Sequence, residues 1–142
     1  MYLLDVNCLM ALGWPNHVHH VRMVEWFTAV GSADWATTAG VQAGFLRVSM
    51  NPAVTGTVVT FAEAGMVLGG LLSTGSHQDV PEVPACEWPD WLTLRIQGYR
   101  QVTDASLVAS AAAGGATLAT LDAGVADLAD AAHRDVVYPI PL

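Results

Sequence analysis

Apolar and polar positions along the chain follow two alternating patterns. Short apolar runs of strand length occupy residues 2–6, 35–38, 116–120 and 136–138, and a weaker one lies within residues 78–83. Between these runs apolar residues recur with helical spacing, which predicts helices over residues 17–30, 39–50, 61–72, 91–96, 103–113 and 127–132. Strands that alternate with helices predict an α/β protein with a mostly parallel central sheet and helices on both faces.

Local signals mark several of the predicted helix ends. Asn16 is a suitable N-cap for the helix over 17–30, and Thr60 with Glu63 has the spacing of a capping box. Gly114 and Gly115 are expected to end the alanine-rich helix that starts near residue 103.

Four polar residues stand where these elements begin or end. Asp5 and Asp122 follow predicted strands, Asp104 begins a predicted helix, and Gln42 lies in the first turns of another. Ligands of parallel α/β sheets bind beyond the carboxyl ends of the strands. We therefore expect these four side chains to converge at one edge of the sheet.

The composition bounds the size and the surface of the protein. With 142 residues, 53% of them hydrophobic, the chain is predicted to form a single domain over residues 1–142. Thirteen acidic residues face only five basic ones, all arginines, for a formal net charge of −8. Such a charge argues against tight, non-specific binding of nucleic acid. Two explanations remain: some acids bind metal ions, or a basic partner covers the acidic surface.

The sequence gives no sign of a membrane or an export route. It has no apolar run of the roughly 20 residues that a membrane span needs, and its first residues lack the basic segment of a signal peptide. We therefore expect a cytoplasmic protein with no membrane partner. In a reducing compartment Cys8 and Cys86 are expected to be small core residues rather than a disulfide.

Several carboxylates at one sheet edge need a counter-charge. Two unit charges about 5 Å apart repel by roughly 3 kcal/mol at an effective dielectric of about 20. Mg²⁺ and Mn²⁺ prefer oxygen ligands, keep several waters and can activate one of them against a phosphodiester. Paired carboxylates also serve glycoside hydrolysis, but nothing in the sequence indicates a long sugar cleft. A receiver-like phosphate-handling domain is disfavoured because the chain has no lysine.

At this point the motifs resemble a known family. The segment LLDVNCLMAL at residues 3–12 is similar to the opening signature of PIN domains, and residues 16–27 resemble the first helix of VapC-type toxins. Residues 37–52, 103–109 and 118–125 are similar to the second, third and fourth motifs, in the family's order and over nearly the whole chain.

The resemblance implies a PIN-like three-layer α/β/α sandwich and Mg²⁺- or Mn²⁺-dependent endonucleolytic cleavage of RNA. It implies a toxin of a bacterial toxin–antitoxin pair, inhibited by a cognate protein antitoxin and commonly a homodimer. Asp5, Asp104 and Asp122 carry over as metal ligands. Thr120 is expected to hydrogen-bond near the metal, and Asn7 to orient Asp5.

The chain departs from the family at one position. The second motif usually has glutamate where this chain has Gln42, which brings no charge and cannot act as a base. We expect weaker metal binding, and an alternative function follows: a catalytically attenuated PIN-like binding module that keeps the antitoxin-binding surface. Arg47, further along the same predicted helix, is a candidate RNA contact. His17, His19 and His20 are poorly spaced for one metal ion on a helix.

Overall fold

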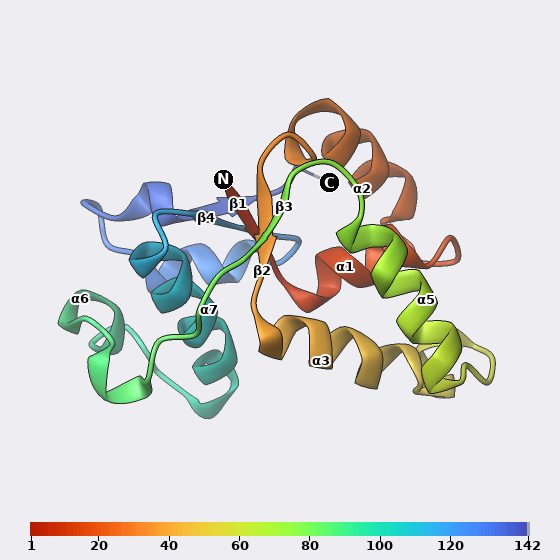
Figure 1. Ribbon diagram of the computed structural model, residues 1–142. Helices are drawn as coiled ribbons and strands as arrows, with labels where there is room; N and C mark the ends of the chain where they lie inside the picture. Colours follow the sequence, from red (N-terminus) through yellow and green to blue (C-terminus); the bar gives the residue numbers. More distant parts are fainter. Residues whose placement is uncertain (142) are drawn as a thin grey trace.

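Five short parallel strands form the centre of the computed structural model, which describes residues 1–141. The strands are β1 (Tyr2–Leu4), β2 (Trp35–Thr37), β3 (His77–Asp79), β4 (Thr117–Thr120) and β5 (Val137–Pro139). Their order in the sheet is β3-β2-β1-β4-β5, and all four neighbouring pairs run parallel (Figure 1). The predicted α/β class is confirmed.

The first strand of the chain is the middle strand of the sheet. Tyr2 pairs with Trp35 of β2 on one side and with Thr117 of β4 on the other. Leu3 and Leu4 are fully buried, as expected for a strand covered on both faces. The residue that follows β1 therefore lies near the middle of the carboxyl edge of the sheet.

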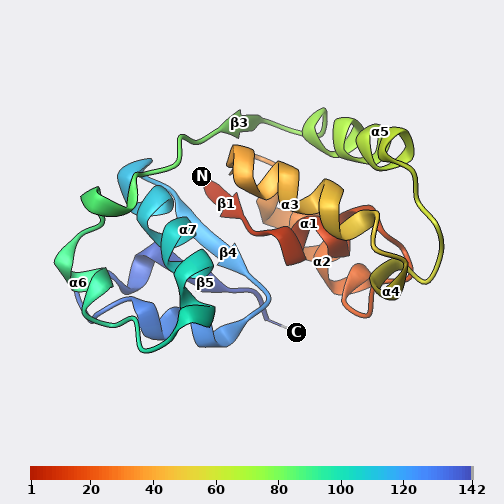
Figure 2. The ribbon, with the colours of Figure 1, turned by 90° about the horizontal axis from the view of Figure 1, so that it is seen from below.

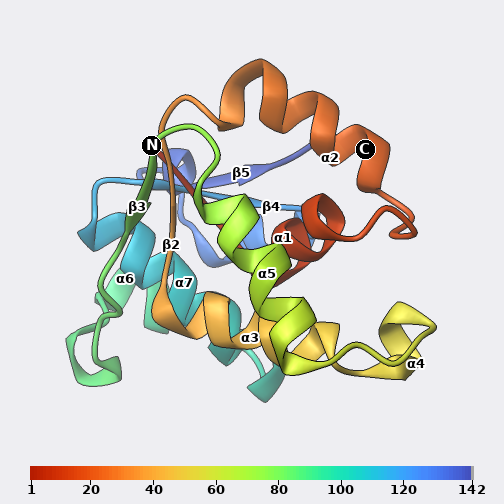
Figure 3. The same cartoon turned by 45° about the vertical axis from the view of Figure 1, so that its right-hand side comes forward.

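Helices cover both faces of the sheet. One side carries α1 (Val6–Gly13), α2 (His20–Trp26), α3 (Ala39–Ser49), the short α4 (Pro52–Thr55) and α5 (Phe61–Leu72), and the other carries α6 (Asp90–Thr93) and α7 (Val102–Ala113) (Figures 1 and 2). Figure 3 shows α5 running across α1 and α3, with which it packs. A π-helical turn (Phe27–Gly31) and 3₁₀ turns (Ala85–Glu87, Tyr99–Gln101, Ala123–Leu128, Arg134–Val136) complete the described elements.

Several predicted element boundaries were wrong, among them the end of the helix expected over 91–96, which stops at Thr93. Val6 belongs to α1, which the sequence did not predict, because the Asp5 side chain accepts a hydrogen bond from Cys8 N–H and caps a helix there. The helix predicted from residue 17 begins at His20 instead, because the Asn16 side chain donates to the Thr55 carbonyl and caps no helix. The helix predicted over 127–132 is replaced by the 3₁₀ turn Ala123–Leu128.

Other predictions were close. The weak strand placed within 78–83 is β3, shifted toward the N-terminus, and the helices ending near 50, 72 and 113 are α3, α5 and α7. Thr60 and Glu63 form the predicted capping box at the start of α5. Cys8 and Cys86 are both free, although Cys86 is exposed and not a core residue. None of the helices within residues 1–141 has the length and apolar content to cross a bilayer.

Candidate active site

Asp5 is the most deeply placed acid of the candidate site. It follows β1 and is 9% exposed. Its Oδ1 accepts a hydrogen bond from Cys8 N–H at 2.7 Å, and its Oδ2 accepts one from the Thr120 hydroxyl at 2.7 Å. Burial raises the pKa of this carboxyl, and the two hydrogen bonds act in the opposite direction. The carboxylate is thus held in one orientation, with one lone pair on each oxygen still available.

Thr120 links Asp5 to the loop that carries Asp122. Thr120 is fully buried at the end of β4, where its hydroxyl donates to Asp5 and accepts from Asp122 N–H at 3.0 Å. The Asp122 carboxylate turns back to accept from Gly124 N–H at 2.8 Å, which starts the following 3₁₀ turn. The structure therefore places the Thr120 hydroxyl between the Asp5 carboxylate and the backbone of Asp122.

Asp104 comes from the opposite helical layer. It lies in the first turn of α7 and is half-buried. Burial raises the pKa of its carboxyl, and the nearby carboxylates of Asp122 and Asp5 raise it further. Asp104 and Asp122 also line one cleft, so Asp104 lies with the other two aspartates at the carboxyl edge of the sheet.

Two open clefts meet at Asp122. We call the first the acidic cleft; its lining residues are Arg100, Gln101, Asp104, Asp122, Gly124, Val125, Asp127 and Leu128. We call the second the histidine cleft; its lining residues are Asn7, His17, Val18, His19, Leu121, Asp122 and Ala123. Asp122 therefore lies where the two clefts meet, whereas Asp104 lines the acidic cleft alone.

Gln42 lies at the same edge but in a separate network. Its Nε2 donates to the Thr37 hydroxyl at 3.0 Å and to the Asp79 carboxylate at 2.8 Å. Thr37 ends β2 and Asp79 ends β3, so the amide is held over the outer strands, whereas Asp5 is held between β1 and β4. No hydrogen bond joins Gln42 to the three aspartates within the described residues.

The remaining predicted residues are more peripheral. Asn7 is exposed at the start of α1 and lines the histidine cleft with Asp122, and it makes no side-chain hydrogen bond to Asp5. Arg47 is exposed in the last turn of α3. His17 and His19 line the same cleft as Asn7, and burial lowers the pKa of His17.

The acids do not form a closed cage. Among residues 1–141, no three His, Cys, Asp or Glu side chains are grouped so as to hold one metal ion. Mg²⁺ is commonly bound by one or two carboxylates, with waters and substrate phosphates filling the other positions. Asp104 and Asp122, which line one cleft above the buried Asp5, fit that open kind of site.

Sequence reasoning missed several neighbours of the site. Asp127 lines the acidic cleft from the turn after β4, and Arg100 lines it from the turn before α7. Asp79 partners Gln42, a pairing that depends on the register of β2 with β3. The one sequence feature that could have pointed to Arg100 is the scarcity of basic residues, since the chain has five arginines and no lysine.

Comparisons with known proteins agree with this geometry. No family model matches the chain. Ribonuclease VapC38 of Mycobacterium tuberculosis is 46% identical over 129 residues, covering 91% of this chain and 90% of that protein. Ribonuclease VapC39 of the same species is 40% identical over 144 residues, covering 95% and 98%. Ribonuclease VapC29 is 35% identical over 147 residues, covering 98% and 96%.

A solved structure supports the fold alone. PAE2754 from Pyrobaculum aerophilum superimposes with a TM-score of 0.60 at 22% identity, covering 91% of this chain and 79% of that one. The parallel sheet with acids at its carboxyl edge defines the PIN-domain class of α/β proteins, as the motifs predict. Within that class, the level and extent of identity show that the chain belongs to the VapC ribonuclease family.

Proposed function

We propose that this protein is a metal-dependent endoribonuclease that hydrolyses RNA phosphodiester bonds and acts as the toxin of a toxin–antitoxin pair in the cytoplasm. The observation that carries the proposal is the convergence of Asp5, Asp104 and Asp122 at one sheet edge. It is supported by the 46% identity to Ribonuclease VapC38.

Asp104 and Asp122 would hold Mg²⁺ or Mn²⁺ in the acidic cleft, with Asp5 beneath them. A bound ion supplies an activated water and neutralises a phosphate oxygen during in-line displacement. The chain's own residues provide the orientation: Thr120 and Cys8 N–H fix the Asp5 carboxylate, and Thr120 also fixes the backbone of Asp122. An RNA strand reaches these groups through the acidic cleft.

Gln42 supports this function indirectly. Its amide donates to Asp79 and so neutralises none of the three aspartates. With the family's glutamate absent, the carboxyl edge of the sheet carries one negative charge fewer, and we expect weak metal binding. The Gln42 amide nitrogen donates to both Thr37 and Asp79, so its role here is to join β2 and β3 at the edge.

We further propose an antitoxin and a second copy of the chain as protein partners. Exposed apolar side chains offer them contact area: Val18 is 85% and Val21 67% exposed near α2, and Phe61 is 63% and Met66 79% exposed on α5. Large apolar residues exposed together are typical of interaction surfaces.

The decisive experiment combines metal and mutation. Purified protein is incubated with bacterial RNA in EDTA, Mg²⁺ or Mn²⁺, and Asp5→Asn is compared with Asp135→Asn. Both variants lose one negative charge, but Asp135 lies with Met1 and Tyr2 at the opposite edge of the sheet. We expect cleavage with metal only, lost in Asp5→Asn and retained in Asp135→Asn.

Two results would contradict the proposal. Cleavage in EDTA, or an active Asp5→Asn protein, would refute the metal-dependent mechanism. Absence of cleavage under all conditions, with Mn²⁺ binding undetectable by calorimetry, would favour the attenuated binding module instead.

A further inference from the structure

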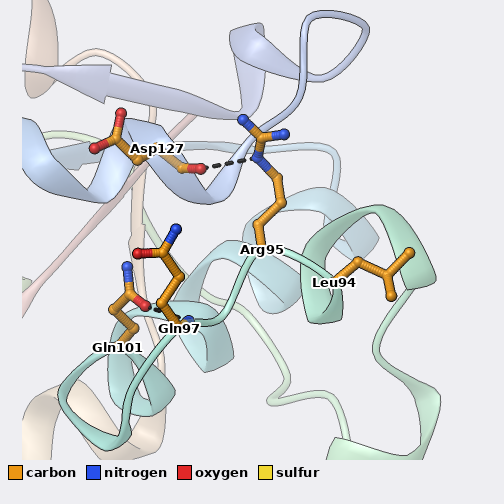
Figure 4. Close-up of a pocket in the computed structure, with 5 residues that line it drawn as sticks. All are labelled: Leu94, Arg95, Gln97, Gln101 and Asp127. Atoms are coloured by element: carbon orange, nitrogen blue, oxygen red, sulfur yellow. Dashed lines mark hydrogen bonds between the residues drawn. The ribbon is translucent and has the colours of Figure 1, made fainter.

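Two of the five arginines in the chain lie beside the candidate active site. Arg100 lines the acidic cleft itself. Arg95 lines an adjoining cleft, which we call the arginine cleft and which is formed by Leu94, Arg95, Gln97, Gln101 and Asp127 (Figure 4). Gln101 and Asp127 line both clefts, so the two adjoin.

Neither guanidinium is neutralised by an acid. Arg95 Nε donates to the main-chain carbonyl of Asp127 at 2.8 Å, and Figure 4 shows the Asp127 carboxylate pointing away from it. Arg100 Nε donates to the phenol oxygen of its neighbour Tyr99 at 3.3 Å, and the guanidinium carbon lies 5.7 Å from the centroid of that ring. The ion pairs formed within residues 1–141 include neither arginine.

The loop between the arginines adds neutral donors. Gln97 N–H donates to Gln101 Oε1 at 2.7 Å, which closes the loop into a turn and fixes the Gln101 side chain (Figure 4). The Gln101 amide nitrogen and the Gln97 amide remain available to a ligand. In a chain of net charge −8, this loop gathers two uncompensated cations and two amides next to the acids.

We propose that Arg95 and Arg100 form the subsite that binds the RNA phosphodiester backbone beside the scissile bond, on the α6–α7 side of the acidic cleft. The inference rests on the proposed ribonuclease function. Guanidinium groups match phosphate geometry and bind it through two parallel hydrogen bonds. An anionic strand approaching three aspartates is repelled, and two fixed cations at the cleft's end offset that repulsion locally.

The test compares charge-matched variants in steady-state cleavage of unfractionated bacterial transfer RNA with Mn²⁺. Arg95→Gln and Arg100→Gln each remove one positive charge from the subsite. Arg134→Gln removes the same charge near Met1 and Tyr2, at the opposite edge of the sheet. Strands of three or four residues span about 10 Å, and the Debye length at physiological salt is about 8 Å, so the control charge is screened from the site.

We expect each subsite variant to raise KM by about tenfold, equivalent to about 1.4 kcal/mol, with kcat within about twofold of wild type. The slope of log(kcat/KM) against log[salt] should fall by about one for each arginine removed. Arg134→Gln should match wild type in both quantities.

A second arm separates charge from structure and does not need cleavage. Arg95→Lys keeps the charge but cannot reproduce the guanidinium fork, so it should recover part of the KM loss. Binding of a fluorescein-labelled oligouridylate is measured by anisotropy in EDTA, where wild type should bind about tenfold more tightly than Arg100→Gln. Thermal unfolding checks that all variants are folded.

The outcomes are distinct from those of the proposed function. Wild type that cleaves no RNA refutes the ribonuclease proposal, and the EDTA binding arm then still decides the subsite. Subsite variants with the KM, salt slope and oligouridylate affinity of Arg134→Gln overturn the inference. If such variants instead lose association with the co-expressed antitoxin, the arginines belong to a protein interface and the RNA subsite is refuted.

Discussion

Replacing Asp104 with asparagine should stabilise the metal-free protein and remove its response to metal. Burial and the carboxylates of Asp122 and Asp5 raise the pKa of Asp104, so its ionised form is unfavourable in the folded state. Asparagine has nearly the same shape and carries no charge. The substitution therefore removes a repulsion that folding creates, and also removes a ligand.

The size of the effect is estimated from the Coulomb repulsion between two partly exposed carboxylates. Two unit charges about 7 Å apart, at an effective dielectric of about 40 for this half-exposed position, repel by roughly 1 kcal/mol. A change of that size shifts the midpoint of a domain of this length by about 3 °C. Metal at about 100 times its Kd stabilises the wild type by about 2.7 kcal/mol, or about 8 °C.

The pH dependence has a definite sign. Since the pKa of Asp104 is higher in the folded state than in the unfolded chain, the folded protein binds this proton more tightly. The stability that this tighter proton binding gives the folded protein is fully present below the ordinary carboxyl pKa. It is lost as pH rises through the raised pKa of Asp104. In EDTA, lowering the pH through the raised pKa of Asp104 should therefore reduce the difference in unfolding midpoint between wild type and Asp104→Asn.

Thermal unfolding followed by circular dichroism provides the assay. Wild type, Asp104→Asn and the control Asp135→Asn are compared in EDTA and in millimolar MnCl₂. We expect Asp104→Asn to melt higher than wild type in EDTA and not to respond to Mn²⁺, while Asp135→Asn responds as wild type does. If Asp104→Asn melts below wild type in EDTA, the Asp104 carboxylate is not repelled by the other two. If its midpoint rises with Mn²⁺ as much as that of wild type, Asp104 is not a metal ligand.

Three further predictions test contacts around the site and the fold, all by urea unfolding. Gln42→Glu should destabilise the protein by about 1 kcal/mol because it places a carboxylate against that of Asp79. Adding Asp79→Asn should restore the stability. If the free-energy changes of the two substitutions simply add, the two side chains are not in contact. Thr120→Val should cost about 1–3 kcal/mol by leaving Asp5 Oδ2 without its donor, whereas Thr120→Ser should be milder; equal losses would deny the hydroxyl this role. Gly75 and Gly115 both have a left-handed φ, of 64° and 63°. A Cβ at Gly75 would meet the Ser32 carbonyl, whereas a Cβ at Gly115 would meet nothing within 4 Å. Gly75→Ala should therefore cost well over the roughly 1 kcal/mol of stability that we expect Gly115→Ala to cost.

Much of the sheet and its edge could be predicted because local signals and periodicity agreed there. The apolar run before Asp5, the capping box of Thr60 and Glu63, and the glycines after α7 each have a local physical cause. The three aspartates could be predicted as a group because acids that follow buried strands share one edge of a parallel sheet.

Helix α1 escaped prediction for an equally physical reason. The helix has only eight residues, and those from Cys8 to Leu12 are all buried, so the segment is too short and too apolar to be told from a buried strand and its loop by periodicity. Asp5 is both the acid after β1 and the N-cap of α1. In the sequence it is read as a strand-end acid, so its capping role is overlooked. The helix is fixed by burial between neighbours, which the local pattern does not contain.

The partners of the site depended on long-range geometry. Gln42 meets Asp79 only through the register of β2 with β3, and Arg95 reaches Asp127 across 32 positions of sequence. The loop carrying Arg95 and Arg100 has no periodic pattern that would place it beside the acids. Its position follows from the packing of α6 against α7.

The central place of β1 has a consequence for how the protein is made. Asp5 is translated well before Thr120, which orients its carboxylate and lies 115 residues later in the chain. At about 5–20 residues per second, that interval lasts about 6–23 s of translation. A nascent or prematurely terminated chain lacks β4 and with it Asp122, so no fragment short of that strand contains the assembled acidic edge. The order of the strands thus keeps the acidic edge unassembled until translation has passed β4.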